Sequence, residues 1–350
     1  MNISEPLISW YLQNKRDLPW RDTDDPYKIW LSEIILQQTR VDQGMEYYLR
    51  FVNTYPNIGF LSKAKRDDVL KNWQGLGYYS RARNLHDTAI YIDKKLDGNF
   101  PSTYDSLLDL KGVGPYTAAA IASFAFKLPH AVVDGNVSRV LSRIFDIDLA
   151  INGTEGIKTI NSLAAECLNR EHPDLHNQAI MELGALICTP QNPGCNICPL
   201  RSHCLARRRK TTSMRPVKIK KAKQKLRYIH YAVLENENGI VFRSRIEKDI
   251  WQGLNDFVSL EGQEELSPID FAAHLKGEFE GMNIDRVPGA PEFECTHQLT
   301  HRRIEAKFWR FRVSGNLPKG DIYKLVERDD IEAVAVPVLV HKYLRKSGWV

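Results

Sequence analysis

Apolar positions in the first two hundred residues recur at the spacing of α-helices, and short breaks rich in glycine or proline separate the periodic segments. One helix is predicted to begin at Asp25-Pro26, because a capping residue precedes proline at the first helical position, and to run to about Arg40. Further helices are expected near Ser4, Ser62, Ser102 and Thr154. Strand signals are almost absent, so this part is predicted to be all-α.

Beyond residue 227 the helical period changes to an alternation of apolar and polar residues, which is typical of strands. The expected elements are a hairpin of residues 228–234 and 240–245, strands at 257–260, 292–299 and 304–313, and helices at 268–275 and 337–345. The sequence therefore predicts a multidomain protein. Its expected parts are an all-α domain at 1–206, a basic linker at 207–227 and an α/β domain at 228–350.

The composition agrees with two folded domains. The chain has 350 residues, 43% of them hydrophobic and 26% charged, as in globular proteins. Its longest apolar stretch, 118–126, is interrupted by Ser123 and is far shorter than the roughly 20 residues that cross a membrane. The first residues lack the pattern of a secretory signal. We therefore expect a cytoplasmic protein that does not contact a membrane.

Positive charge is concentrated between the two predicted domains. The net charge is only +5, but residues 207–227 contain eleven lysines and arginines and no acidic residue. Such a strip can displace counterions from a polyanion such as DNA. A solvated linker has the same composition, so charge alone leaves both interpretations open.

Four of the six cysteines form a cluster in the sequence and are candidates for a metal site. Cys188, Cys195, Cys198 and Cys204 are separated by six, two and five residues. Four thiolates suit tetrahedral zinc and an iron-sulfur cluster equally well, and the spacing favours the cluster only mildly. Cys167 and Cys295 stand apart and are interpreted as ordinary thiols.

A glycine-rich turn separates two of the predicted helices, 104–110 and 116–126. In it, Gly112, Val113 and Gly114 allow a tight hairpin whose backbone N–H groups point outward beside a helix N-terminus. Such a nest binds phosphate without reading base sequence. A plain helix-helix turn is the alternative.

Two carboxylates are candidates for acid-base chemistry. Glu33 shares a helix face with apolar and aromatic residues, and burial there raises a carboxyl pKa and keeps a proton available near neutrality. Asp134 precedes a predicted helix, whose N-terminus favours the ionised form. An acid paired with an anion is what cleavage of a glycosidic bond requires. The alternatives are a surface glutamate and an ordinary N-cap aspartate.

Several strings taken together resemble one known family. They are LPWR at 18–21, PYKIWLSE at 26–33, LQQT at 36–39, GLGYYSRARN at 75–84, the glycine turn, VDGNV at 133–137 and the cysteine spacing. The first domain is similar over essentially its whole length to the adenine DNA glycosylases of the helix-hairpin-helix superfamily. These enzymes remove adenine mispaired with 8-oxoguanine.

The resemblance implies a role for each matching residue. Glu33 corresponds to the general acid that protonates adenine N7 and later positions water, and Asp134 to the carboxylate that stabilises the cationic sugar or bonds to it. Tyr116 and Asn136 correspond to residues that support this pair. Arg21, Leu36, Val41 and Gln178 match the pocket for the extruded adenine, whereas Gln38 and Tyr78 match residues that wedge beside the lesion base.

The resemblance also implies a cofactor, a reaction type and a partner. The cysteine spacing is that of one [4Fe-4S] cluster in this family. Tyr116 stands where related bifunctional enzymes carry a lysine that forms a Schiff base, so a monofunctional DNA N-glycosylase is expected. The implied partner is double-stranded DNA with adenine opposite 8-oxoguanine or guanine. We expect a monomer, associated with the nucleoid in a bacterium.

The second domain resembles the C-terminal domain of the same enzymes, which has the nudix fold of nucleotide-diphosphate hydrolases and contacts 8-oxoguanine. Residues 298–301 (QLTH) lie where the family places a Phe-Ser-His loop, so Thr300 keeps a hydroxyl and Leu299 lacks the aromatic ring. No Arg-Glu-x-x-Glu-Glu metal signature follows Gly253, and nucleotide hydrolysis is not expected.

Two other functions remain open at this point. One is a bifunctional endonuclease III-like glycosylase and lyase for oxidised pyrimidines, which Tyr116 disfavours. The other is a non-catalytic iron-sulfur protein that binds DNA lesions, which the presence of both Glu33 and Asp134 disfavours.

Overall fold

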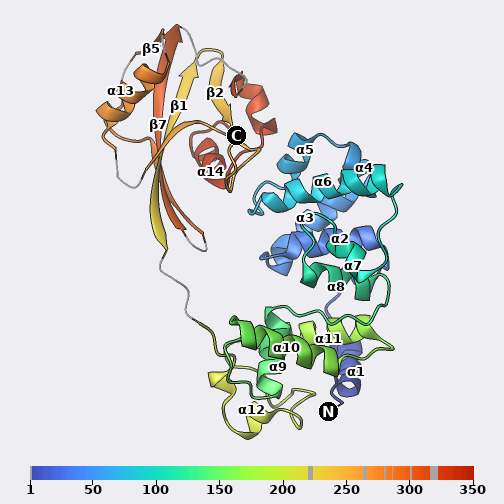
Figure 1. The fold of residues 1–350 in the computed structure, drawn as a ribbon. Coiled ribbons are helices and arrows are strands. Elements are labelled where there is room, and N and C mark those ends of the chain that lie inside the picture. Colours follow the sequence, from blue (N-terminus) through green and yellow to red (C-terminus); the bar gives the residue numbers. More distant parts are fainter. Residues whose placement is uncertain are drawn as a thin grey trace. The chain divides into compact units, whose positions relative to one another are not determined.

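The computed structural model describes residues 2–219, 224–262, 266–279, 281–285, 287–299, 302–315 and 322–350. They form two compact units (Figure 1). The helical unit comprises Met1–Ser62 and Asp87–Lys221, and the sheet unit comprises Lys63–His86 and Ala222–Val350. No helix in the described ranges is long and apolar enough to span a membrane.

Short helices joined by tight turns build the helical unit. They are α1 (Ser4–Asn14), α2 (Pro26–Leu36), α3 (Val41–Thr54), α4 (Ile58–Lys63), the later part of α6 (Ser80–Lys95), α7 (Tyr104–Leu108), α8 (Pro115–Phe124), α9 (Gly135–Ile144), α10 (Thr154–Cys167), α11 (Pro173–Leu186) and α12 (Leu205–Arg208). Leu7, Leu141 and Leu183 belong to one core that joins α1, α9, α10 and α11. Helix α2 is buried almost all round and contacts α3 and α8.

Helix α2 begins where the sequence predicts it and ends earlier. The Asp25 side chain accepts a hydrogen bond from the Tyr27 backbone N–H at 2.9 Å, as expected of an N-cap. The helix ends at Leu36 and does not continue to Arg40, because Gln38 has a left-handed backbone with φ of 60°. That conformation costs a non-glycine residue about 1 to 2 kcal/mol. It turns the chain sharply into α3.

Two other sequence predictions also differ from the structure. Ser62 does not begin a helix but lies in α4, where its hydroxyl donates to Asp93 Oδ2 at 2.7 Å. Residues 207–219, predicted as linker, fold onto the helical unit through α12, the 3-10 helix η1 (Thr212–Met214) and a bridge between Ala150 and Val217. An ion pair of 3.0 Å joins Arg215 to Asp146 and fixes this stretch. Residues 220–223 of the predicted linker lie outside the described residues.

The described strands of the sheet unit form one mixed sheet. They are β1 (Lys225–Asn236), β2 (Gly239–Ser244), β3 (Asn255–Asp256), β4 (Val258–Gly262), β5 (Met282–Ile284), β6 (Phe293–Gln298), β7 (Arg302–Gly315) and β8 (Tyr323–Val326). Their order is β3-β2-β1-β7-β5, with β4 on β1, β6 on β7 and β8 on β2. The long strands β1 and β7 are parallel, with Lys225 opposite Arg302 and Glu235 opposite Arg312, and the other pairs are antiparallel.

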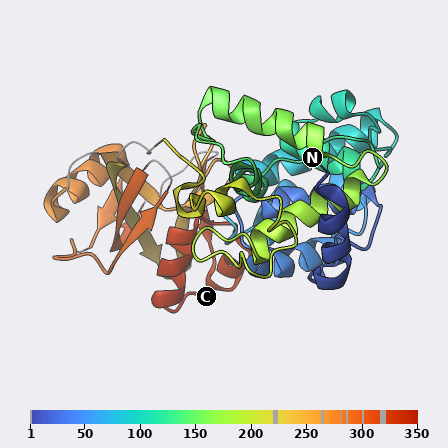
Figure 2. The ribbon, with the colours of Figure 1, turned by 90° about the horizontal axis from the view of Figure 1, so that it is seen from below.

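Helices cover the two faces of this sheet. Figures 1 and 2 show α13 (Pro268–Glu278) and α14 (Val338–Lys346) on opposite sides of it. Leu234 and Phe311 share a core with α13, whereas Phe308, three residues before Phe311 on β7, stacks on Tyr343 of α14 with ring centroids 4.8 Å apart. Successive residues of a strand point to opposite faces of the sheet, and helices cover both of these faces.

The sheet unit includes a segment from early in the chain. Residues 63–86, which contain α5 (Arg66–Asn72) and the start of α6, pack with the 3-10 helix η2 (Arg328–Ala333) and its surroundings. The Arg83 guanidinium donates to the Gln252 carbonyl at 2.6 Å, and Gln74 accepts from the Val336 backbone N–H at 3.2 Å. Both units are thus formed from segments that are discontinuous in sequence.

Candidate active site

A cavity of about 210 Å³ in the helical unit brings together most of the predicted catalytic and substrate-binding residues. Of the predicted residues it contains Glu33, Tyr116, Asp134, Asn136, Arg21, Leu36, Val41 and Gln178. They come from α2, α3, α8, α11, the start of α9 with its N-cap, and the loop that precedes α2. Packed helices hold most of these side chains, so the site is largely preformed.

Glu33 lies in the buried middle of α2 and is only 7% exposed. Burial raises its pKa to about 7, and the negative charge of Asp134 adds to this effect, whereas a hydrogen bond with the Tyr116 hydroxyl lowers the pKa. A substantial fraction of Glu33 therefore carries a proton at neutral pH. This is the state that an acid catalyst needs.

Asp134 caps helix α9, and its carboxylate is held by local hydrogen bonds. Its Oδ1 accepts from the Val137 backbone N–H at 2.7 Å, and its Oδ2 accepts from the Asn136 amide at 2.8 Å. Burial raises its pKa above the ordinary value, and these hydrogen bonds, together with the positive charge of nearby Arg139, oppose the rise. The helix N-terminus favours the ionised form of Asp134, as the sequence predicts, but burial has the larger effect on its pKa.

The same cavity contains an ion-pair cluster that the sequence analysis missed. The Glu182 side chain is fully buried and accepts hydrogen bonds from the Arg16 and Arg21 guanidinium groups at 2.7 to 3.0 Å. Burial opposes its ionisation, yet these arginines hold the pKa of Glu182 at about 2. A single acid in the apolar run of α11, four residues after Gln178, was the available signal.

Gln178 is fixed by a tyrosine from the first helix. The Tyr11 hydroxyl donates to Gln178 Oε1 at 2.5 Å, and burial raises the pKa of Tyr11 to about 12, so it remains a donor. Arg21 lies over the same tyrosine ring, 5.5 Å from its centroid. Tyr11 thus orients two polar side chains of the pocket at once.

Three of the predicted substrate-binding residues do not line this cavity. Gln38 is exposed just beyond α2, and Tyr78 of the sheet unit is 50% exposed. Both have left-handed backbones, with φ of 60° and 49°. Thr300 lies outside the described residues.

The glycine turn has the geometry of a tight hairpin before α8. Gly112 has φ of 81°, a conformation that favours glycine, and Val113 packs inward with 7% exposure. Gly114 is the N-cap, and a Cβ added there would meet nothing within 4 Å. Space is therefore available at Gly114 for the close approach of another backbone.

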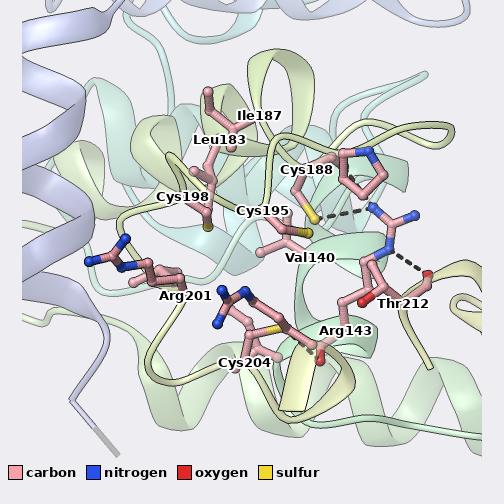
Figure 3. A pocket seen from close by; sticks show the side chains of 14 residues that line it. Val140, Arg143, Leu183, Ile187, Cys188, Cys195, Cys198, Arg201, Cys204 and Thr212 are labelled. Atoms are coloured by element: carbon pink, nitrogen blue, oxygen red, sulfur yellow. Dashed lines mark hydrogen bonds between the residues drawn. The ribbon is translucent and has the colours of Figure 1, made fainter. Parts of the chain in front are cut away.

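The four clustered cysteines line a second cavity of about 30 Å³ (Figure 3). All four are free thiols, and the Arg143 guanidinium donates to Cys188 Sγ at 3.3 Å and to the Thr189 carbonyl at 2.7 Å. Within the described ranges, no three His, Cys, Asp or Glu residues form a group that could hold a metal ion. The loop nevertheless turns all four thiols toward one space.

A chain of hydrogen bonds links the carboxylate site to the cysteine loop. Asn136 donates to Asp134, and its Oδ1 accepts from Arg139 Nη2 at 2.8 Å. Arg139 Nε donates in turn to the Cys188 carbonyl at 2.7 Å, and its Nη2 also donates to the Gly184 carbonyl at 2.7 Å. The position of Asn136 therefore depends on the backbone at Cys188.

Comparisons with known proteins decide the family. Residues 31–164 match the model of the HhH-GPD superfamily base excision DNA repair proteins, and residues 230–346 match the NUDIX domain. An adenine DNA glycosylase of Buchnera aphidicola subsp. Baizongia pistaciae is 38% identical over 269 residues, which cover 75% of each chain. The chain belongs to the adenine DNA glycosylases. This confirms the predicted family and fold class.

Further relatives agree with this assignment. The human adenine DNA glycosylase is 44% identical over 212 residues, which cover 58% of this chain and 39% of the human one. The solved structure of a thermostable thymine-DNA glycosylase matches with a TM-score of 0.54 and 29% identity, over 59% of this chain and 95% of that one. Endonuclease III in a DNA complex shares the fold at 19% identity, with a TM-score of 0.51 over 59% and 94% of the chains. The family is that of DNA N-glycosylases of base excision repair.

Proposed function

We propose that this protein is a monofunctional glycosylase that hydrolyses the N-glycosidic bond of adenine opposite 8-oxoguanine or guanine in double-stranded DNA. The observation that carries the proposal is the pairing of Glu33, whose pKa is about 7, with Asp134 in one cavity. The names of the relatives supply adenine as the base. We further propose a monomer that works in the cytoplasm, at the bacterial nucleoid.

The geometry supports an acid-assisted departure of the base. Adenine must leave the base stack of the DNA duplex to enter the cavity, where Arg21 and Gln178 offer polar contacts to its edge. Glu33 gives its proton to adenine N7, and the bonding electron pair of the glycosidic bond moves into the base. Asp134 stabilises the positive charge that develops on the sugar. Water then adds to the sugar carbon, and the proton that it loses restores Glu33.

Tyr116 supports the assignment as monofunctional. A lyase step needs an amine that attacks the sugar carbon, and Tyr116 offers a phenol whose pKa is raised well above 10 by burial. Its hydrogen bond to Glu33 gives it a role in orienting the acid. We propose that Asn136 orients Asp134 in the same way, because its side-chain amide donates a hydrogen bond to Asp134 Oδ2 at 2.8 Å.

DNA contacts outside the cavity are proposed for three further groups of residues. The backbone N–H groups around Gly112, Val113 and Gly114 would bind a phosphate of the target strand. Exposed Gln38 and Tyr78 would wedge beside the lesion base, and Thr300 would donate a hydrogen bond to 8-oxoguanine.

The cysteine loop fits one [4Fe-4S] cluster. Its donor set is four free thiols facing one cavity, which suits iron-sulfur ligation by Cys188, Cys195, Cys198 and Cys204. When bound, the cluster would cross-link the loop and place its charge near the basic residues that follow. Glu33 and Asp134 supply the acid and the anion, so no chemical step requires the cluster.

Duplex substrates separate this proposal from its rivals. The pure protein is incubated with duplexes that contain adenine opposite 8-oxoguanine, guanine or thymine, or a thymine glycol. Strand breaks are scored with and without alkali. We expect breaks only after alkali and only at adenine opposite 8-oxoguanine or guanine. Breaks without alkali or at thymine glycol would show a lyase for oxidised pyrimidines, and no breaks at all would show a binding protein.

A further inference from the structure

A third cavity of the helical unit lies beside the catalytic cavity and takes no part in the steps above. Its volume is about 300 Å³, and it is lined by Tyr104, Pro115, Tyr116, Ala119, His130, Ala131, Val133 and Asn161. We call it the flanking cavity. Tyr116 lines both cavities, and Val133 directly precedes Asp134. A DNA strand that places a base against Tyr116 and Asp134 therefore passes over or beside the flanking cavity.

Two stacked rings form a wall of the flanking cavity. Tyr104 and His130 lie face to face with centroids 4.4 Å apart and planes within 9°. The backbone at His130 is rigid, because the buried Asn177 amide donates to the His130 carbonyl at 2.8 Å and accepts from the Val132 N–H at 3.0 Å. Tyr104 is the first residue of α7, which the Thr103 hydroxyl caps. The wall is therefore formed before any ligand binds.

The polar atoms of this wall are free for a ligand. Within the described ranges, neither the Tyr104 hydroxyl nor the His130 ring makes a hydrogen bond to the protein. No acidic side chain lines the flanking cavity. Stacking covers one face of each ring and leaves the polar edges open, so the Tyr104 hydroxyl and one ring N–H of His130 can still donate hydrogen bonds. Donors without a nearby carboxylate favour an anion.

We propose that the flanking cavity binds a phosphodiester of the target strand next to the extruded adenine, through the Tyr104 hydroxyl and the His130 ring. This rests on the proposed function and deepens it. The glycine turn continues directly into Pro115 and Tyr116, which line the flanking cavity, so one strand can contact both the turn and this cavity. Two fixed phosphates set the register in which a base enters the catalytic cavity.

The test combines side-chain variants with neutral phosphate linkages. Duplexes with adenine opposite 8-oxoguanine carry one methylphosphonate at each position around the adenine in turn. Binding to the full-length protein is measured for the original chain, Tyr104→Phe and His130→Ala. Tyr91→Phe, at a 49% exposed tyrosine outside the cavity, is the matched control. Tyr104→Phe keeps the ring and removes only the hydroxyl.

At one linkage we expect the methylphosphonate to weaken binding by the original chain about ten-fold, as for a lost charge-assisted hydrogen bond. In His130→Ala, the methylphosphonate at this linkage should weaken binding little, because the contact is already lost. In Tyr104→Phe, it should weaken binding less than in the original chain.

Equal methylphosphonate effects in all four proteins would overturn the phosphate site. Binding that changes with the identity of the base next to the adenine, and that none of the methylphosphonates weakens, would also overturn it and would indicate a contact to that base. Failure of the original chain to release adenine from unmodified duplex would instead count against the proposed function. The two failures are therefore distinguishable.

Discussion

Replacing Glu182 with glutamine removes the buried negative charge that two arginines share in the catalytic cavity. The Glu182 side chain is fully buried, and it accepts from Arg16 Nη2 at 2.7 Å and from Arg21 Nη2 at 2.8 Å. Glutamine has nearly the same size but offers one acceptor oxygen and no charge. Arg16 and Arg21 would therefore lose their counter-ion. We expect a folded but less stable protein in which Arg21 is less well ordered.

Two independent routes give the size of the loss. The fall of the Glu182 pKa from 4.5 to about 2 corresponds to about 3 kcal/mol in the free energy of unfolding. Breaking a buried ion pair by removing one partner costs about 3 to 5 kcal/mol. For a domain of this size, about 1 kcal/mol lowers Tm by roughly 2 to 4 °C. Glu182→Gln should therefore lower Tm by at least about 6 °C.

Thermal unfolding at several pH values tests the origin of this loss. The pKa of Glu182 is lower in the folded than in the unfolded state, so its stabilisation is fully present above pH 4.5 and is lost as pH falls toward about 2. The Tm difference should be constant from about pH 8 to 5 and should shrink below that. Exposed Glu46→Gln is the control. A Tm at pH 7 within about 2 °C of the original chain would refute the reasoning.

Three further outcomes follow from the site. Because Glu33 must be protonated to act, the single-turnover rate should fall as pH rises through about 7. Glu33→Gln should abolish excision while retaining DNA binding. Normal turnover of that variant would contradict the role of Glu33 as the acid. Cys198→Ser should lower the iron content and weaken DNA binding, and unchanged iron by elemental analysis would remove the cysteine from the ligand set. Arg139→Gln should lower the single-turnover rate at saturating DNA about ten-fold, because Asn136 loses a charged partner, and should also lower Tm, because the Cys188 and Gly184 carbonyls lose their donor. A lower Tm with an unchanged rate would contradict the proposed role at Asn136.

Short motifs made the centre of the site predictable from sequence. Glu33 follows the Pro26 helix start by two turns, and Asp134 stands at a recognisable helix cap, so local pattern alone places each on its element. That the two meet in one cavity was not visible in either motif. The resemblance of the surrounding strings supplied that step.

Partners distant in sequence explain what the sequence analysis missed. Glu182 pairs with Arg16, 166 residues away, and no local rule connects them. The end of α2 was misplaced because Gln37 and Gln38 are compatible with a helix, and only the fold imposes the left-handed turn at Gln38. Residues 207–219 were taken as linker because their charge suggests solvent, yet Arg215 pairs with Asp146. Propensity and charge do not reveal such tertiary contacts.

The discontinuity of the sheet unit has a consequence for the order of folding. Residues 63–86 emerge early from the ribosome, whereas Gln252 and Val336, the partners of Arg83 and Gln74, are synthesised far later. Domains usually form in the order of synthesis, N-terminal first. Here the hydrogen bonds of Arg83 and Gln74 cannot form until Gln252 and Val336 have been synthesised. The sheet unit is therefore completed late, and a truncation that removes Val336 should also destabilise residues 63–86.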